Sequence, residues 1–324
     1  MSFWRVTAKR IGYGFLLLMS VLVLNFVLMS LAPGDIADTI AGEMGGADEQ
    51  MLAEIRETYG LDQPFHVQLW RYLSRVFVLD LGFSYFYNTP VTTLILEKLP
   101  ATLLLVFSAQ IVAIISGVVL GVMAAKKPNG LFSLSVTLIA LFGFAAPVFW
   151  TGILLIILFV SIFPLFPIGG IMDVTLAGSW WEHTLDVLHH LMLPMITLAS
   201  IFVALYSRLA RASMLEVLGA DYIRTARAKG VPERSVMYRH ALRNALAPVV
   251  TVAGLQFSAV ISGAVVVETV FSWPGLGSLA LHSILARDTP TIMGILFCSA
   301  LVVVVFNILT DMTLRLLDPR IKSG

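Results

Sequence analysis

Six long apolar stretches restrict this chain to folds that a lipid bilayer can solvate. They cover Ile11–Leu31, Ala101–Ala125, Leu131–Phe163, Leu191–Leu209, Leu246–Val267 and Thr291–Leu309. A helix crosses the hydrocarbon core with about 20 mainly apolar residues. The chain is 58% hydrophobic and only 13% charged, whereas soluble domains are about 25% charged. The sequence therefore predicts an all-α membrane protein with six transmembrane helices. Gly143, Pro147 and Gly152 predict a kink or a tilt in the third.

Basic residues are concentrated in alternate connecting segments. Segments 1–10, 126–130, 207–245 and 311–324 hold 16 of the 21 Lys and Arg residues but only 5 of the 20 Asp and Glu residues. The positive-inside rule places such segments in the cytoplasm. We therefore expect both termini to be cytoplasmic. The first apolar stretch is longer than the core of a signal peptide, which predicts an anchor that stays in the protein.

The order of these stretches predicts four parts. Residues 1–31 form a cytoplasmic N-terminus with the first transmembrane helix, and residues 32–98 form an extracytoplasmic helical segment. Residues 99–312 form a core of five spans, and residues 313–324 form a cytoplasmic tail. Within the second part, helices are expected at 48–59 and 65–79. A membrane-surface role and a protein-docking role are equally open for them.

Polar groups on the outward side suggest two further features. The loop 164–190 contains acids and histidines that could bind a transition metal or could be an ordinary polar loop with interfacial histidines: Asp173, Glu182, His183, Asp186, His189 and His190. Glu268 directly follows an apolar run, so it is a functional candidate, although it could instead pair with Arg287 or reach water. Trp273-Pro274-Gly275 predicts a tight turn after it.

One glycine motif and the single cysteine have structural interpretations, and several catalytic motifs are missing. Gly117 and Gly121 form a GxxxG pair that permits close helix packing. Cys298 is the only cysteine, which excludes an internal disulfide and favours a small core or lipid-facing residue. The sequence has no Walker A loop, no HExxH and no GxSxG. If the protein transports a solute, its energy must therefore come from another subunit.

The segment 208–243 is the one sizeable loop predicted to be cytoplasmic. Its residues 221–229 predict a short helix, which Gly230 would end in a left-handed cap, and Pro232 suits the first turn of the next helix. Pro248 is expected to mark the start of the following span. Positive-inside bias explains the basic residues but not the small ones. A helix with little bulk, flanked by Arg224, Arg227 and Lys229, can fit a groove on another protein.

Several motifs of this chain resemble those of ABC importer permeases of the peptide and nickel branch. Residues 221–230 are similar to the pattern DY-[IV]-RTA-x-AKG of the cytoplasmic EAA loop, with Arg-Thr-Ala in place of Glu-Ala-Ala. The stretches APGD at 32–35, YGLDQP at 59–64, FSWPGLG at 271–277 and LLDPRIK at 316–322 resemble the same branch. The resemblance covers nearly the whole chain in the right order.

The resemblance implies a type I ABC importer permease fold in a bacterial cytoplasmic (inner) membrane. It implies four partners besides lipid, namely a second homologous permease subunit, two cytoplasmic ATPase subunits and an extracytoplasmic solute-binding protein, and no nucleic acid. No cofactor and no metal would be bound by this chain, because ATP and Mg²⁺ would bind the ATPase subunits. The implied coupling residues are Ala220, Asp221, Tyr222, Arg224, Thr225, Ala226, Arg227, Ala228, Lys229 and Gly230. Candidate pathway or gate residues are Phe144, Pro147, Gln256 and Glu268.

The expected function is therefore that of a non-catalytic permease subunit for dipeptides, oligopeptides or similar solutes. Nickel-chelate import and glutathione import are alternatives within the class. A stand-alone secondary transporter is the alternative from another class, and a membrane enzyme is more distant because no catalytic constellation is present.

Overall fold

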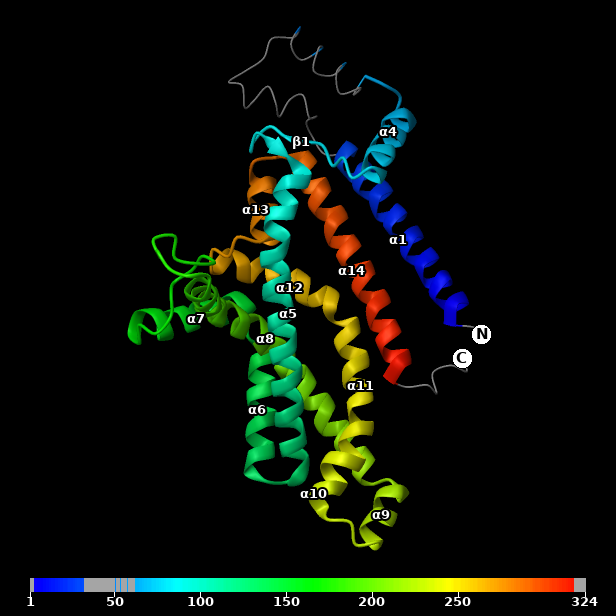
Figure 1. Cartoon of the computed structure of the whole chain (residues 1–324), viewed down its shortest axis with the longest axis vertical. Helices are drawn as coiled ribbons and strands as arrows, with labels where there is room; N and C mark the ends of the chain where they lie inside the picture. The colour runs from blue at the N-terminus through cyan, green and yellow to red at the C-terminus, as the bar shows by residue number, and fades with distance from the viewer. Residues whose placement is uncertain (1–2, 32–49, 51–52, 54–56, 58–61, 318–324) are drawn as a thin grey trace. The chain divides into compact units, whose positions relative to one another are not determined.

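The computed structural model describes residues 3–31, 50, 53, 57 and 62–317 (Figure 1). Nearly all of the described elements are helices. The chain forms two compact units, one built from residues 1–100 and 275–308 and the other from residues 101–274 and 309–324. Two long helices, α5 (Val91–Lys126) and α14 (Thr289–Leu317), contribute residues to both units.

In the first unit, α1 (Phe3–Leu31) packs against α4 (Phe65–Phe77). Phe26 contacts the rings of Phe65 and Tyr72, with centroid distances of 5.3 and 5.6 Å. The helix predicted at 65–79 is confirmed, whereas the one predicted at 48–59 falls almost entirely outside the described residues. A short hairpin pairs the two-residue strands β1 (Phe83–Ser84) and β2 (Thr89–Pro90), a small departure from an all-helical chain.

The core of this unit is formed where the start of α5 meets α13 (Leu276–Leu285) and the first part of α14. It contains Val91, Leu94, Ile95, Leu276, Leu279, Ile295 and Cys298. Cys298 is buried, in agreement with its interpretation as a small core residue.

The second unit begins with the remainder of α5 and contains the long helix α8 (Trp180–Leu218). Between them lie α6 (Leu131–Ala145), α7 (Val148–Ile156) and the π-helix η1 (Ile157–Ile162). After α8 the chain forms α9 (Asp221–Ala228), α10 (Glu233–Ser235), the π-helix η2 (Val236–Ala241), α11 (Leu242–Leu255) and α12 (Phe257–Val270). Figure 1 shows α9 and α10 at one end of this unit, where α8 and α11 converge.

The GxxxG pair packs α5 directly against the backbone of α8. A Cβ on Gly121 would lie 2.7 Å from Ala210 Cβ and 2.9 Å from the backbone nitrogen of Arg211. A Cβ on Gly117 would lie 3.1 Å from the backbone nitrogen of Ser207. The two helices therefore approach so closely that only glycine fits at both positions.

Among the described residues, four helices are long and apolar enough to cross a membrane, and two bent helix pairs raise the number to six if each pair is one span. The first bend, of 105°, separates residues 131–143 from 148–162, which confirms the kink expected around Pro147. The second bend, of 61°, separates 233–255 from 259–270 and was not predicted. Pro248 lies inside α11, which begins at Leu242, so this proline does not mark the start of the helix.

The helices also extend beyond the apolar stretches that predicted them. α5 begins at Val91 instead of Ala101, and α8 runs over 39 residues from Trp180 to Leu218 instead of Leu191–Leu209. Thirty-nine residues of helix measure about 58 Å, whereas the hydrocarbon core is about 30 Å thick. Hydropathy locates the part of a helix that lipid covers, but it does not detect the polar turns that extend the helix at either end.

Candidate functional site

The helix α9 and the turn after it form the segment that the sequence singled out. Gly230 has a φ of +77°, as its predicted role in a left-handed cap requires. Its backbone N–H donates to the Arg227 carbonyl at 2.9 Å, and the Val231 N–H donates to the Ala226 carbonyl at 3.2 Å. A Cβ on Gly230 would meet nothing within 4 Å, so glycine is needed here for its backbone conformation and not for space.

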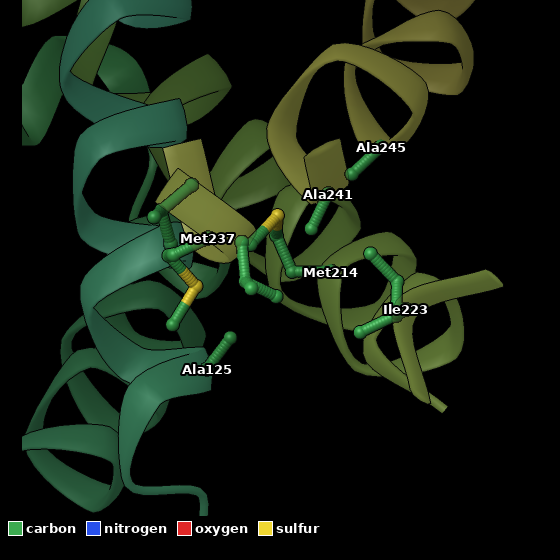
Figure 2. Close-up of a cluster of buried hydrophobic side chains, with 8 residues drawn as sticks. Ala125, Met214, Ile223, Met237, Ala241 and Ala245 are labelled. Atoms are coloured by element: carbon green, nitrogen blue, oxygen red, sulfur yellow. The ribbon is translucent and has the colours of Figure 1, made fainter. Parts of the chain in front are cut away.

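One side of α9 is anchored in the protein through Ile223. This side chain is fully buried in a cluster that joins α5, α8, α9, η2 and α11 (Figure 2). The Ile223 cluster consists of Val122, Ala125, Met214, Ile223, Val236, Met237, Ala241 and Ala245. Burying an isoleucine side chain stabilises a protein by about 1.5–3 kcal/mol. The cluster therefore ties α9 to three long helices of the unit.

The opposite side of α9 is exposed. Asp221, Arg224, Thr225 and Ala228 follow one another at helical spacing and are all solvent-accessible. Arg224 approaches Asp221 at 3.4 Å, a contact between two strongly exposed side chains. Among the remaining predicted coupling residues, Tyr222, Arg227, Lys229 and Gly230 are exposed, and Ala220 and Ala226 are half-buried. The surface has little bulk at its centre and positive charge on both flanks.

Two polar contacts hold α9 against the helices that follow it. The Arg227 guanidinium donates to both carboxylate oxygens of Glu233, at 2.7 and 3.1 Å, across the turn at Gly230. This hydrogen bonding raises the pKa of Arg227. Asn244 Nδ2 donates to the Tyr222 hydroxyl at 2.9 Å. Exposed contacts of this kind contribute about 0–1 kcal/mol each, so their main effect is to fix the angle of the turn.

Sequence reasoning missed Ile223, Glu233 and Asn244. Ile223 is the only large aliphatic residue in DYIRTARA, and a single apolar position in a short polar helix indicates the side that faces the protein. No local pattern indicates the roles of Glu233 and Asn244, because their partners Arg227 and Tyr222 are brought to them only when the turn folds.

Glu268 lies in α12, fully buried, and accepts a 2.6 Å hydrogen bond from Thr102 Oγ1. Trp273, also fully buried, donates from its indole N–H to the Ala101 carbonyl at 2.9 Å. Together these contacts join the end of α12 to the start of the α5 segment in this unit.

The turn after α12 differs from its prediction. Ser272, with a φ of +49°, is the residue in the left-handed region, and Gly275 has a φ of −104°. Ser272 N–H donates to the Thr269 carbonyl and Trp273 N–H to the Glu268 carbonyl, at 3.3 and 2.8 Å. This is the hydrogen-bond pair of a Schellman helix end. The turn is therefore built by the end of α12, with Gly275 preceding the first residue of α13.

The other pathway candidates lie at the two helix breaks. Pro147 is exposed and directly precedes α7, whereas Phe144 lies near the end of α6 with its side chain outside the described part of the structure. Gln256 is half-buried between α11 and α12. All three positions thus lie at or beside a change of helix direction.

A buried glutamine that was not predicted lies close to the second break. Gln110 Nε2 donates to the Tyr206 hydroxyl at 2.8 Å and to the Ala253 carbonyl at 3.1 Å. The amide thereby supplies a partner to a carbonyl in the last turn of α11. The apolar sequence around Gln110 gives no indication of this role, because Tyr206 and Ala253 lie far away along the chain.

The acids and histidines between residues 164 and 190 bond to the loop and to α8. His189 Nε2 lies 2.8 Å from the Leu165 carbonyl, and Asp186 accepts from the backbone N–H of Asp173 at 2.6 Å. Glu182 forms a capping box with Ser179 at the start of α8. Among the described residues, no three His, Cys, Asp or Glu side chains are placed to hold a metal ion. Hydrogen bonds to Thr175 lower the pKa of Asp173.

The fold is that of a type I ABC importer permease. A chain of the MetNI methionine ABC transporter, solved in an inward-facing conformation, matches it with a TM-score of 0.51 and 15% identity, over 69% of this chain and 96% of that one. The chain belongs to the family of binding-protein-dependent transport system inner membrane components. The family model matches residues 117–323, and the model of the family's N-terminal region matches residues 3–106.

Relatives are similar over their full length. The oligopeptide transport system permease protein AppB of Bacillus subtilis is 39% identical, over 94% of this chain and 95% of its own. The di/tripeptide transport system permease protein DppB of Pseudomonas aeruginosa is also 39% identical, over 97% of this chain and 98% of its own.

Proposed function

We propose that this chain is the membrane-spanning permease subunit of an ATP-driven ABC importer for dipeptides or oligopeptides. Family membership supports the class, and full-length similarity to oligopeptide and di/tripeptide permeases supports the solute. The chain is a multi-pass inner-membrane protein. It is the non-catalytic subunit, since permease subunits of this class leave ATP hydrolysis to partner subunits.

The complete importer would contain four further components. These are a second homologous permease subunit, two cytoplasmic ATPase subunits that bind ATP and Mg²⁺, and an extracytoplasmic solute-binding protein. Both termini and α9 would face the cytoplasm, in agreement with the distribution of basic residues.

In this proposal α9 is the coupling helix. The observation that supports it is the two-sided character of α9, which exposes Arg224, Thr225 and Ala228 while Ile223 is buried in its cluster. A groove on an ATPase subunit would receive the exposed side. Closure of the ATPase subunits would then displace α9, and the Ile223 cluster would pass the displacement to α5, α8 and α11. The membrane helices would switch between inward-open and outward-open states as a result.

Bulky variants of the exposed side test this mechanism. Ala228→Trp should abolish ATP-driven uptake in proteoliposomes while the subunit still inserts and folds, because the indole would not fit a groove shaped for a small residue. Asn129→Trp, on the exposed short loop between α5 and α6, is the matched control and should transport normally. Undiminished uptake by Ala228→Trp would disprove the coupling role of α9.

The solute is tested with the purified complex and its binding protein. Labelled di- and oligopeptides should be taken up with ATP, and glutathione and nickel chelates should not. Uptake of either in place of peptides would establish one of the alternatives. Uptake by this chain without ATPase subunits would establish a stand-alone transporter, the reading that family membership disfavours.

The pathway residues remain part of the proposal. Pro147 and Gln256 lie at helix breaks, where a change of bend angle could open a path, and Phe144 precedes the first break. Glu268 is buried against Thr102, so the geometry supports a role in holding the outer part of the helices together during the switch.

A further inference from the structure

A groove lies between α6 and α8, near the end of α8 that leads to α9. Its volume is about 540 Å³. The walls are mostly apolar, with Val136 on α6 and Ala204, Leu205 and Leu209 on α8. Two arginines of α8, Arg208 and Arg211, lie in the same lining. The positive-inside rule accounts for arginines at this end of α8, and here the two arginines adjoin a mostly apolar wall.

Arg211 is held in place by neutral partners. Its Nε donates to Ser133 Oγ at 3.0 Å, and its Nη2 donates to the Pro128 carbonyl at 3.1 Å. These bonds use two of the five guanidinium N–H groups. The side chain is thus fixed, and among the described residues no acid neutralises its charge and three donors have no hydrogen-bond partner.

Arg208 is exposed, and no hydrogen bond or ion pair joins it to another side chain in the part of the chain that the structure describes. The nearby hydroxyls do not need an added ligand, because Thr137 donates to the Ser133 carbonyl and Ser207 to the Ala204 carbonyl. The groove therefore offers guanidinium donors specifically. Arg208 and Arg211 are three residues apart on one helix, close enough to bind one anion together.

We propose that this groove binds an anionic phospholipid. The phosphate would accept hydrogen bonds from Arg208 and Arg211, because guanidinium groups bind phosphate in a bidentate manner. An acyl chain would lie along the apolar wall formed by Val136, Leu205 and Leu209. Basic pockets between membrane helices are typical sites for anionic headgroups.

The position of the groove suggests what the lipid does. Arg211 lies three residues before Met214, which belongs to the Ile223 cluster. A bound lipid would therefore stabilise the segment of α8 to which α9 is anchored. The inference requires a membrane protein with this groove at a bilayer surface and does not depend on the identity of the solute.

The test is a lipid titration of the purified, delipidated complex by native mass spectrometry. Phosphatidylglycerol should bind the wild type more tightly than phosphatidylcholine, and Arg208→Gln should weaken phosphatidylglycerol binding about tenfold, as expected for one charge-assisted contact. Phosphatidylcholine binding should not change. Arg234→Gln, which removes an exposed arginine of α10, is the matched control and should bind like the wild type.

A photoreactive amino acid at Leu205 identifies the occupant. In membranes it should crosslink to phospholipid. Crosslinking to the second permease subunit instead, or equal phosphatidylglycerol binding by Arg208→Gln and the wild type, would overturn the proposal. Glycerol phosphate should not compete, since it lacks the acyl chain; competition at equal concentration would show a soluble-phosphate site instead.

Discussion

Two helix ends in the second unit close on a residue with positive φ, and only one of them has glycine there. Gly230 ends α9, and Ser272 ends α12 with the same pair of hydrogen bonds. The left-handed conformation costs a non-glycine residue about 1–2 kcal/mol. Gly230 was predictable because glycine favours this position. The positive φ of Ser272 was not predictable, because serine does not favour this conformation. The tight turn was predicted at the nearby Gly275 instead.

Exchanging these residue types should shift stability in opposite directions. Ser272→Gly should raise the free energy of unfolding by about 1 kcal/mol, since relief of strain exceeds the entropy that glycine costs. Gly230→Ser should lower it by about the same amount for the converse reason. Thermal unfolding of the purified protein in detergent measures both. A Ser272→Gly variant that melts below the wild type would contradict this account of the turn.

Two substitutions of Glu268 test whether its side chain serves only as a hydrogen-bond acceptor or whether transport requires its carboxyl group. Glu268→Gln keeps an oxygen that can accept from Thr102, so folding should be close to normal. Glu268→Ala removes the acceptor and leaves a cavity, which should cost about 3 kcal/mol. Melting temperature and uptake are measured together. Normal stability with lost uptake in Glu268→Gln would instead show that the carboxyl group itself takes part in transport.

At the scale of whole elements, hydropathy located the spans but not their ends or breaks. The kink at Pro147 was predictable, because proline removes a backbone donor within the span. Close to the break at Gln256, Gln110 on another helix donates to the Ala253 carbonyl. A contact between residues 143 positions apart leaves no local pattern. The prediction of the short helix at 221–229 was accurate because the residues that indicate its end, Gly230 and Pro232, lie next to it in the sequence.

The close approach of α5 and α8 gives an element-scale prediction. Gly121→Ala should lower the free energy of unfolding by about 1–3 kcal/mol, because its Cβ would press against the backbone nitrogen of Arg211. Gly12→Ala is the matched control, since a Cβ there meets nothing within 4 Å. That variant should be neutral or more stable by up to about 1 kcal/mol. Equal effects of the two substitutions on the melting temperature would show that the GxxxG contact is unimportant.

For the whole molecule, the first bent helix pair decides on which side of the membrane α9 lies, because the second pair follows α9 in the chain. If both pairs are spans, the chain crosses six times; if both are re-entrant, it crosses four times. Both numbers are even, so the termini lie on one side in either case and their location cannot distinguish the two topologies. The positions of Val174 and Lys229 can. A re-entrant first pair would leave Val174 on the side of the N-terminus and would move α9 to the opposite side, away from cytoplasmic ATPase subunits.

Cysteine labelling distinguishes these topologies, because the single native cysteine, Cys298, is buried. We expect a membrane-impermeant maleimide to label Val174→Cys on intact spheroplasts, since Val174 is 88% exposed in the loop before α8. Lys229→Cys should react only after permeabilisation. Labelling of Lys229→Cys from outside would place α9 beyond the reach of the ATPase subunits. It would overturn the coupling role of α9 and contradict the positive-inside rule for the eight basic residues of segment 207–245. Family membership would stay intact, because it rests on sequence similarity.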